Sequence, residues 1–268
     1  MAFRLSLEVY WIRKRCSLSR FKLKIEYDGR PYIGWQRQSY GPSVQNFLEN
    51  AVFAFSGERV EVAGAGRTDK GVHATGQVAH IQLANNKFDA KTVMKAINAL
   101  IRPEPIVVVA AEEVKEDFHA RFSAIERCYH YEILNRYAPT ALYRGLVWHV
   151  KAPLFVEAMQ EAAHCLVGHH DFTSFRARQC QSNSPEKTLD QLDIFRKSEN
   201  RIVIIARSRS FLHHQMRNMV GTLALVGIGK WTSCKVSEVL AARQRSAAGP
   251  TAPPDGLYLT SVKYPNES

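Results

Sequence analysis

Apolar and polar side chains alternate strictly in RFKLKIEYDG, residues 20–29, where the apolar members are Phe21, Leu23, Ile25 and Tyr27. A period of two residues places these side chains on one face, so the segment is predicted to be a half-buried strand that ends in an Asp-Gly turn. The next apolar stretch, residues 43–55, changes to helical spacing and has Ser43 in the position of an N-cap. The chain therefore begins its periodic part with a strand followed by a helix.

Strands and helices continue to follow one another along the chain. Further strands are predicted at residues 60–62, 77–83, 106–113, 128–135, 191–195, 202–208 and 257–264. Further helices are predicted at residues 90–100, 154–166, 212–227 and 236–242. Because neighbouring strands are joined by short turns, antiparallel pairing is favoured. The predicted fold class is α+β rather than a doubly wound parallel sheet.

The order of elements predicts two similar α/β halves, residues 20–125 and 126–268. Their mostly antiparallel sheets are expected to lie side by side, flanked by helices, with the active-site cleft between the halves. Residues 1–19 precede the first predicted strand and are predicted to be a disordered N-terminal extension. Their Arg, Lys and Ser content is also compatible with an organelle transit peptide or with a start codon set too early.

The charge of the chain indicates an anionic partner. Lys and Arg number 36 against 25 Asp and Glu, a formal charge of +11. Nucleic acid is the commonest partner of such a chain, although a merely solubilising surface gives the same count. The basic residues also cluster between positions 196 and 217, at Arg196, Lys197, Arg201, Arg207, Arg209 and Arg217. That asymmetry favours a basic face.

Two other classes of protein are excluded by composition. No run of about 18 apolar residues occurs, so no transmembrane helix is predicted. The five cysteines lie far apart without a C-x-x-C pair, at Cys16, Cys128, Cys165, Cys180 and Cys234. A zinc site or disulfide framework is therefore not expected, and a reducing, cytoplasm-like compartment fits this chain best.

The segment AGAGRTDKGVHATG, residues 63–76, carries a single carboxylate, Asp69, between Arg67 and Lys70. Nearby cations favour the ionised form of an acid, which makes Asp69 a competent nucleophile or base and a poor general acid. An ordinary turn aspartate is the alternative, but the surrounding glycines permit a close approach to a ligand. The segment lacks the nucleotide-binding patterns G-x-x-x-x-G-K-[ST] and G-x-G-x-x-G.

Histidine pairs occur at His169–His170 and at His213–His214. Neither pair has metal-ligand spacing, and adjacent residues on a helix point in different directions. Structural or RNA-contacting histidines are therefore favoured, and neither a metal nor another cofactor is expected. The nucleophile-elbow pattern G-x-S-x-G is also missing, which weighs against a serine hydrolase.

Aromatic and basic side chains are interleaved in two regions, at Phe118, Phe122, Tyr129 and Tyr131 around Arg121 and Arg127, and then at Phe172, Phe175, Arg176 and Arg178. Such mixtures can stack unpaired bases and hold phosphates. Tyr129 and Tyr131 share one face of a predicted strand, so they are equally compatible with a core. The residues thus indicate a basic, RNA-binding α/β protein with one activated aspartate, but they do not identify its reaction.

Several long motifs occur in a familiar order: KIEYDGRPYIGWQRQ, AGRTDKGVHA, FHARFSA, CYHYEI and FLHHQMRNMVG. On these motifs the chain, from about residue 20 to its end, resembles the TruA family of tRNA pseudouridine synthases. The resemblance implies a cofactor-free isomerase that converts uridine to pseudouridine at positions 38, 39 and 40 of the tRNA anticodon stem-loop. It also implies a homodimer with a positively charged RNA-binding cleft. The localisation expected from the cysteines is cytoplasmic, with organellar targeting by residues 1–19 as the alternative.

The same resemblance assigns roles to individual residues. Asp69 would be the catalytic nucleophile, and Arg217 would pair with it. Tyr129 would stack on the target base and is a candidate for moving a proton, while Arg67 would fill the space left by the flipped uridine. The implied RNA contacts are Phe118, His119, Ala120, Arg121, Phe122, Gln179, Cys180, Gln181, Ser182 and Asn183. Lys70 departs from the small residue common in the family, and residues 179–188 match its pattern only in their first half.

Isomerisation must break the bond between C1′ and N1 of uridine and rejoin the base through C5. A nucleophile can reach these atoms only when the base leaves the helix. Attack at C1′, attack at C6 and a glycal route all remain open. So do two alternative functions, a catalytically silent RNA-binding protein on the same scaffold and a pseudouridine synthase that acts on another RNA.

Overall fold

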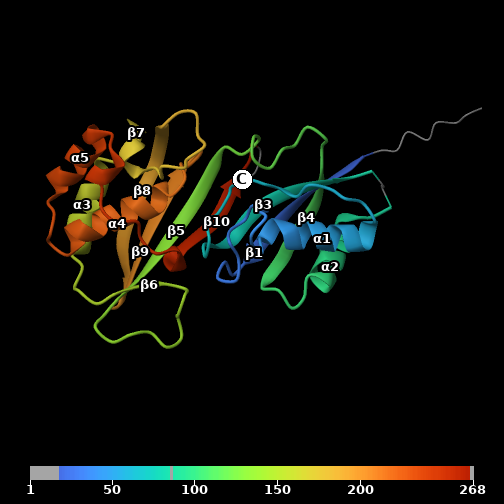
Figure 1. Cartoon of the computed structure of the whole chain (residues 1–268), viewed down its shortest axis with the longest axis horizontal. Helices are drawn as coiled ribbons and strands as arrows, with labels where there is room; N and C mark the ends of the chain where they lie inside the picture. The colour runs from blue at the N-terminus through green and yellow to red at the C-terminus, as the bar shows by residue number, and fades with distance from the viewer. Residues whose placement is uncertain (1–17, 85–86, 266–268) are drawn as a thin grey trace, which may run out of the picture.

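A ten-stranded sheet forms the centre of the computed structural model, which describes residues 18–84 and 87–265 (Figure 1). The strands are β1 (Ser19–Tyr27), β2 (Ala63–Gly64), β3 (His73–Leu83), β4 (Ile106–Val114), β5 (Glu126–Asn135), β6 (Trp148–Val150), β7 (Gly168–Asp171), β8 (Glu186–Ser198), β9 (Arg201–Ser208) and β10 (Leu257–Lys263). Their order is β4-β1-β3-β10-β5-β9-β8-β7, with β2 added to β3 and β6 to β5. Only the β3–β10 and β5–β6 pairs of this described sheet are parallel. The predicted α+β class is confirmed.

The α-helices of the described residues gather at the two ends of the sheet (Figure 1). They are α1 (Val44–Ser56), α2 (Ala90–Leu100), α3 (Val156–His164), α4 (Gln215–Gly227) and α5 (Ser233–Ala242). At one end α1 packs on α2 and α2 on β4, and at the other α3 packs on β8, α4 and α5. No described helix is long and apolar enough to cross a bilayer.

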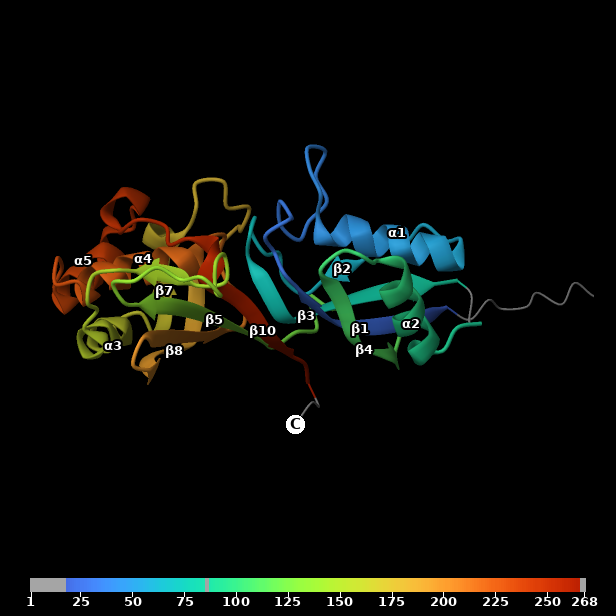
Figure 2. The same ribbon diagram turned by 90° about the horizontal axis from the view of Figure 1, so that it is seen from below.

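The last strand joins the two ends of the sheet. β10 pairs in parallel with β3 and antiparallel with β5, and Figure 2 shows it crossing the middle of the molecule between them. The two predicted halves therefore share one continuous sheet. Their boundary at residues 125 and 126 stays a prediction, because β10 contacts strands from both. Of the predicted extension, residues 1–17 lie outside the described part of the chain, and Ser19 is already the first residue of β1.

Local signals placed most of the long elements. Ser43 caps α1 as expected, because its hydroxyl accepts a hydrogen bond from the backbone N–H of Asn46 at 3.3 Å. The strand predicted at residues 60–62 is wrong, since pairing begins only at β2. Two strands were missed, β6 and β7, which are three and four residues long and too short to show a period. The predicted helix at 212–227 begins later, at Gln215, because His214 has a φ of 62° that no right-handed helix contains.

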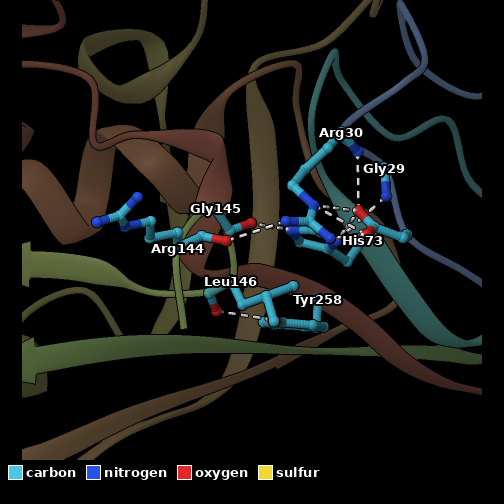
Figure 3. Close-up of polar contacts among 8 residues, drawn as sticks. Gly29, Arg30, His73, Arg144, Gly145, Leu146 and Tyr258 are labelled. Carbon is cyan, nitrogen blue, oxygen red and sulfur yellow. Dashed lines mark hydrogen bonds and ion pairs between the residues drawn. The ribbon is translucent and has the colours of Figure 1, made fainter. Parts of the chain in front are cut away.

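Residues 136–147 connect β5 to β6. A polar network holds this connection against His73 of β3 and Tyr258 of β10 (Figure 3). His73 Nε2 lies 2.9 Å from the carbonyl oxygen of Gly145. The hydroxyl of Tyr258 donates to the carbonyl of Leu146 at 2.7 Å, and the His73 and Tyr258 rings stack 4.8 Å apart. Because His73 is the first residue of β3, these contacts fix the chain directly after the glycine-rich loop.

Close contact across the β3–β10 junction gives a test of its role. A Cβ at Gly76 would lie 2.1 Å from the backbone oxygen of Thr260. We expect Gly76→Ala to lower the free energy of unfolding by about 1–3 kcal/mol, because the strands must move apart. Urea denaturation measures the change. Thr75→Ala, at an exposed position of the same strand, should stay within about 0.5 kcal/mol of wild type. Equal denaturation midpoints for the two variants would show that a Cβ at residue 76 fits between β3 and β10 without cost, so that their close contact does not contribute to stability.

Candidate active site

The glycine-rich loop between β2 and β3 lies against the segment that follows β1. Gly34, at a φ of 125°, forms a bridge with Asp69, and a Cβ there would be 2.6 Å from the Thr68 carbonyl oxygen. That carbonyl accepts a hydrogen bond from the Trp35 N–H at 3.1 Å, while the hydroxyls of Thr68 and Tyr27 lie 2.7 Å apart. The loop is therefore held on both its backbone and its side chains, and it presents Asp69 in one position.

Three cationic or polar side chains surround the Asp69 carboxylate, which is 17% exposed. Arg217 donates from Nη1 to Oδ2 at 3.2 Å and from Nε to the Ala252 carbonyl at 2.8 Å. His213 Nε2 lies 3.3 Å from Oδ1, and His214 Nε2 lies 3.4 Å from Oδ2. The structure thus brings Arg217 to Asp69, together with two histidines to which sequence reasoning gave no role there.

The pKa of Asp69 is set by opposing effects. Burial raises it, whereas the hydrogen bond from His213 and the charges of His214, His213 and Arg217 lower it, and the net pKa falls below the usual aspartate value. The carboxylate is therefore ionised at neutral pH. The sequence interpretation credited the adjacent cations with this effect, but the groups responsible come from the start of α4. Neighbours in sequence were mistaken for neighbours in space.

The two histidines converge rather than diverge. They precede α4, and the left-handed backbone of His214 turns both rings toward Asp69, 4.1 Å apart between centroids. The expectation that they would point in different directions assumed a helix and is wrong. Ligand atoms of Asp69, His213 and His214 all lie within 4.8 Å of one another, a spacing that a metal ion could use, although the guanidinium of Arg217 opposes a cation there. The absence of a metal stays a prediction.

Tyr129 lies beside this cluster on β5, with 9% of its surface exposed. Burial and the negative charge of Asp69 raise the pKa of its phenol, so the hydroxyl is protonated at neutral pH. Its ring packs edge-on against Phe211 at 5.0 Å between centroids. Tyr131, two residues on, is fully buried and donates to the Pro253 carbonyl at 2.7 Å. Of these two tyrosines, Tyr131 is part of the core and Tyr129 lines the site.

A cleft of about 1920 Å³ opens above Asp69, and residues of both predicted halves line it. Its basic side chains include Arg67, Lys70, Arg121 and Lys187. Arg67 donates across the cleft to the side-chain oxygen of Gln181 at 3.0 Å. A cationic cleft with one ionised carboxylate at its floor suits an anionic polymer that presents an uncharged reacting group.

The residues expected to contact RNA divide into two sets. Ala120 is fully buried, and its carbonyl accepts a hydrogen bond from Tyr264 at 2.7 Å, while Phe118 packs on the Tyr264 ring. These two side chains are directed inward, and Asn183 is not among the cleft residues. The expected residues that do line the cleft are His119, Arg121, Phe122, Gln179, Cys180, Gln181 and Ser182.

The source of the Asp69 charge can be tested without a substrate. We expect His213→Leu to raise the Asp69 pKa, because the hydrogen bond and the positive potential of the imidazole are lost while burial remains. Lys70→Met should leave this pKa unchanged, although Lys70 is adjacent in sequence. Carbon-13 NMR titration of labelled aspartate measures both variants. A larger shift in Lys70→Met than in His213→Leu would contradict the assignment.

Known proteins resemble this chain over most of its length. A sequence model described as tRNA pseudouridine synthase matches residues 24–123 and 162–265. The tRNA pseudouridine synthase A of Rhodospirillum rubrum is 58% identical over 249 residues, 93% of this chain and 89% of that protein. The protein of the same name from Rhodospirillum centenum is 57% identical over 247 residues, 92% of this chain and all of that protein. The resemblance inferred from the motifs is confirmed: the chain belongs to the TruA family of tRNA pseudouridine synthases, which are isomerases.

Proposed function

We propose that this isomerase converts uridine to pseudouridine in the anticodon stem-loop of tRNA, at positions 38, 39 and 40, with Asp69 as the nucleophile. The observation that carries the proposal is the ionised carboxylate held by Arg217 and two histidines at the floor of a basic cleft. An ionised carboxylate removed from water, with its orientation fixed, is prepared to attack.

The chemistry begins when the uridine leaves the helix and enters the cleft, at a cost of a few kcal/mol that contacts to the flipped base must offset. Three routes fit this arrangement. If Asp69 attacks C1′, its carboxylate oxygen displaces N1, and the Asp69–C1′ bond breaks when C5 of the turned base bonds to C1′. If Asp69 adds to C6, the C1′–N1 bond breaks, the base turns and bonds to C1′ through C5, and the Asp69–C6 bond then breaks. In the glycal route Asp69 takes the proton from C2′ as the C1′–N1 bond breaks, and returns it when C5 bonds to C1′. In each route the hydrogen on C5 leaves as a proton and N1 gains one. The product contains the same atoms as the substrate, so the reaction consumes no co-substrate.

Two further side chains have proposed roles in this cycle. Tyr129 would stack on the base and hold its hydroxyl toward the reacting atoms. Because its pKa is raised, the phenol is protonated but is a weak acid, so it can give its proton only to a strongly basic atom, and it can accept the C5 proton only after losing its own. Arg67 donates a hydrogen bond to Gln181, which is exposed. When RNA binds, Arg67 would give up this contact and fill the gap that the flipped uridine leaves in the RNA stack.

A catalytically silent RNA-binding protein is a weaker candidate, because RNA binding alone would not require an ionised carboxylate in the cleft. We also propose that the enzyme is cytoplasmic, as its cysteine usage favours, and that it works as a homodimer, as the resemblance implies. Analytical ultracentrifugation of the purified chain tests the dimer, and mass spectrometry of the mature N-terminus tests for removal of an organelle transit peptide.

The reaction and its nucleophile are tested together. On unmodified tRNA transcripts, wild type should form pseudouridine at positions 38–40, mapped by carbodiimide-stop sequencing. Asp69→Asn should abolish this activity, because an amide cannot attack, while the dissociation constant for tRNA stays within about threefold or tightens as one negative charge is lost.

Glu61→Gln is the matched control, since Glu61 is another carboxylate that lines the cleft but lies outside the Asp69 cluster, and it should keep wild-type activity. Wild type that binds every transcript yet modifies none would rule out the enzyme and leave the RNA-binding alternative. Pseudouridine at other positions would refute the proposed specificity alone.

A further inference from the structure

Arg127 lies on β5, two residues before Tyr129, and only 7% of its surface is exposed. All five of its N–H donors reach backbone carbonyl oxygens. Nε and Nη2 donate to Ala65 at 3.3 and 2.8 Å, Nη1 to Arg209 at 2.5 Å and to Ala124 at 3.4 Å, and Nη2 also to Arg121 at 2.6 Å. Across the described residues, no Asp or Glu forms an ion pair with this guanidinium.

A buried cation without a carboxylate partner is unfavourable unless hydrogen bonds replace its hydration. Burial accordingly lowers the Arg127 pKa. A neutral side chain can hold a backbone carbonyl at less cost, as buried Gln77 does by donating to Gly66 at 2.7 Å. What an amide cannot do is hold several chain segments at once, because it has two donors where the planar guanidinium has five.

The carbonyls held by Arg127 belong to three separate walls of the cleft. Ala65 lies in the glycine-rich loop between β2 and β3, which carries Asp69 and is called the catalytic loop below. It directly precedes Gly66, whose carbonyl accepts the hydrogen bond from Gln77. Arg121 and Ala124 belong to the connection before β5, which carries Arg121 and Phe122 into the cleft. Arg209 follows β9 and leads to the segment of His213 and His214. One side chain therefore fixes the loop of Asp69 relative to two other segments: the one that leads to His213 and His214, and the connection before β5.

We propose that Arg127 is a positioning residue that sets the distance of Asp69 from the substrate, by tying the catalytic loop to residues 121–124 and to Arg209. That the substrate is tRNA rests on the proposed function, whereas the hydrogen bonds that connect the three segments do not. Arg127 does not touch the reacting atoms in this arrangement, so its removal should slow the chemical step more than it weakens tRNA binding.

Arg127→Lys tests this role, because lysine keeps the charge and offers three donors in place of five. In single-turnover reactions with saturating enzyme, the rate constant should fall by about 100-fold, the order of loss caused by a displacement of about 1 Å. The tRNA dissociation constant should change less than about threefold. Because tRNA is limiting in these reactions, partial unfolding alone would raise the enzyme concentration needed for saturation and leave the saturating rate constant unchanged.

Arg207→Lys is the matched control. Although Arg207 belongs to the basic cluster of residues 196–217, it is not among the residues that line the cleft. It lies on β9 at the partly exposed surface and pairs at 2.9 Å with Glu126, the residue that precedes Arg127. Its variant should keep the wild-type rate. Chemical rescue adds a second measurement: millimolar guanidinium should partly restore the rate of Arg127→Ala, whereas methylammonium at the same concentration should not.

Hydrogen exchange tests the tie independently of activity. In Arg127→Lys, peptides covering residues 63–72 and 117–125 should lose protection together, and in Arg207→Lys both should exchange as in wild type. The inference is overturned if Arg127→Lys keeps the wild-type rate constant or if the two peptides keep wild-type protection. If wild type itself leaves tRNA unmodified, the proposed function fails, and the exchange result alone decides whether Arg127 positions the loop.

Discussion

The structure depends on keeping one carboxylate charged where little water reaches it. Burial alone would raise the Asp69 pKa, so partners that favour the charged form must be supplied from the protein. Those partners lie at the start of α4, while Asp69 lies between β2 and β3. The two segments are brought together by the sheet, in which β10 connects β3 to β5 and β9 continues on the other side of β5. The continuous sheet is therefore a condition for the ionised state of Asp69.

Glycine in this site acts through its small size more than through mobility. Gly34 allows the segment after β1 to contact the backbone of the glycine-rich loop, and Gly76 allows β3 to approach β10. Around these contacts the loop is held by Trp35 and Tyr27. A glycine-rich sequence thus gives a rigid loop, because each close approach excludes other positions of the backbone.

Local sequence patterns predicted the structure where local forces determine it. The alternation in residues 20–27 and the cap at Ser43 both follow from contacts within a few residues. The start of α4 could not be predicted, because the left-handed backbone of His214 has no periodic signature. The motif resemblance placed Arg217 beside Asp69, as the structure does, but the reasoning from the residues alone assigned the charge to the adjacent Arg67 and Lys70 and missed His213 and His214. The partners of a buried group depend on pairing between distant strands, which one sequence does not display.

The distribution of charge within the cleft also explains how a negative residue can work on a polyanion. At the floor, Asp69 is balanced by Arg217 and lies beside two histidines, so the local net charge is small. Arg67 and Arg121, for which the described residues supply no ion pair, lie elsewhere on the cleft surface. Uracil is uncharged, whereas each phosphate of the backbone is negative. Under the proposed function, a flipped base would approach the carboxylate while the phosphates stay with the cations, and this separation would let one cleft bind RNA and retain an anion that can act as a nucleophile.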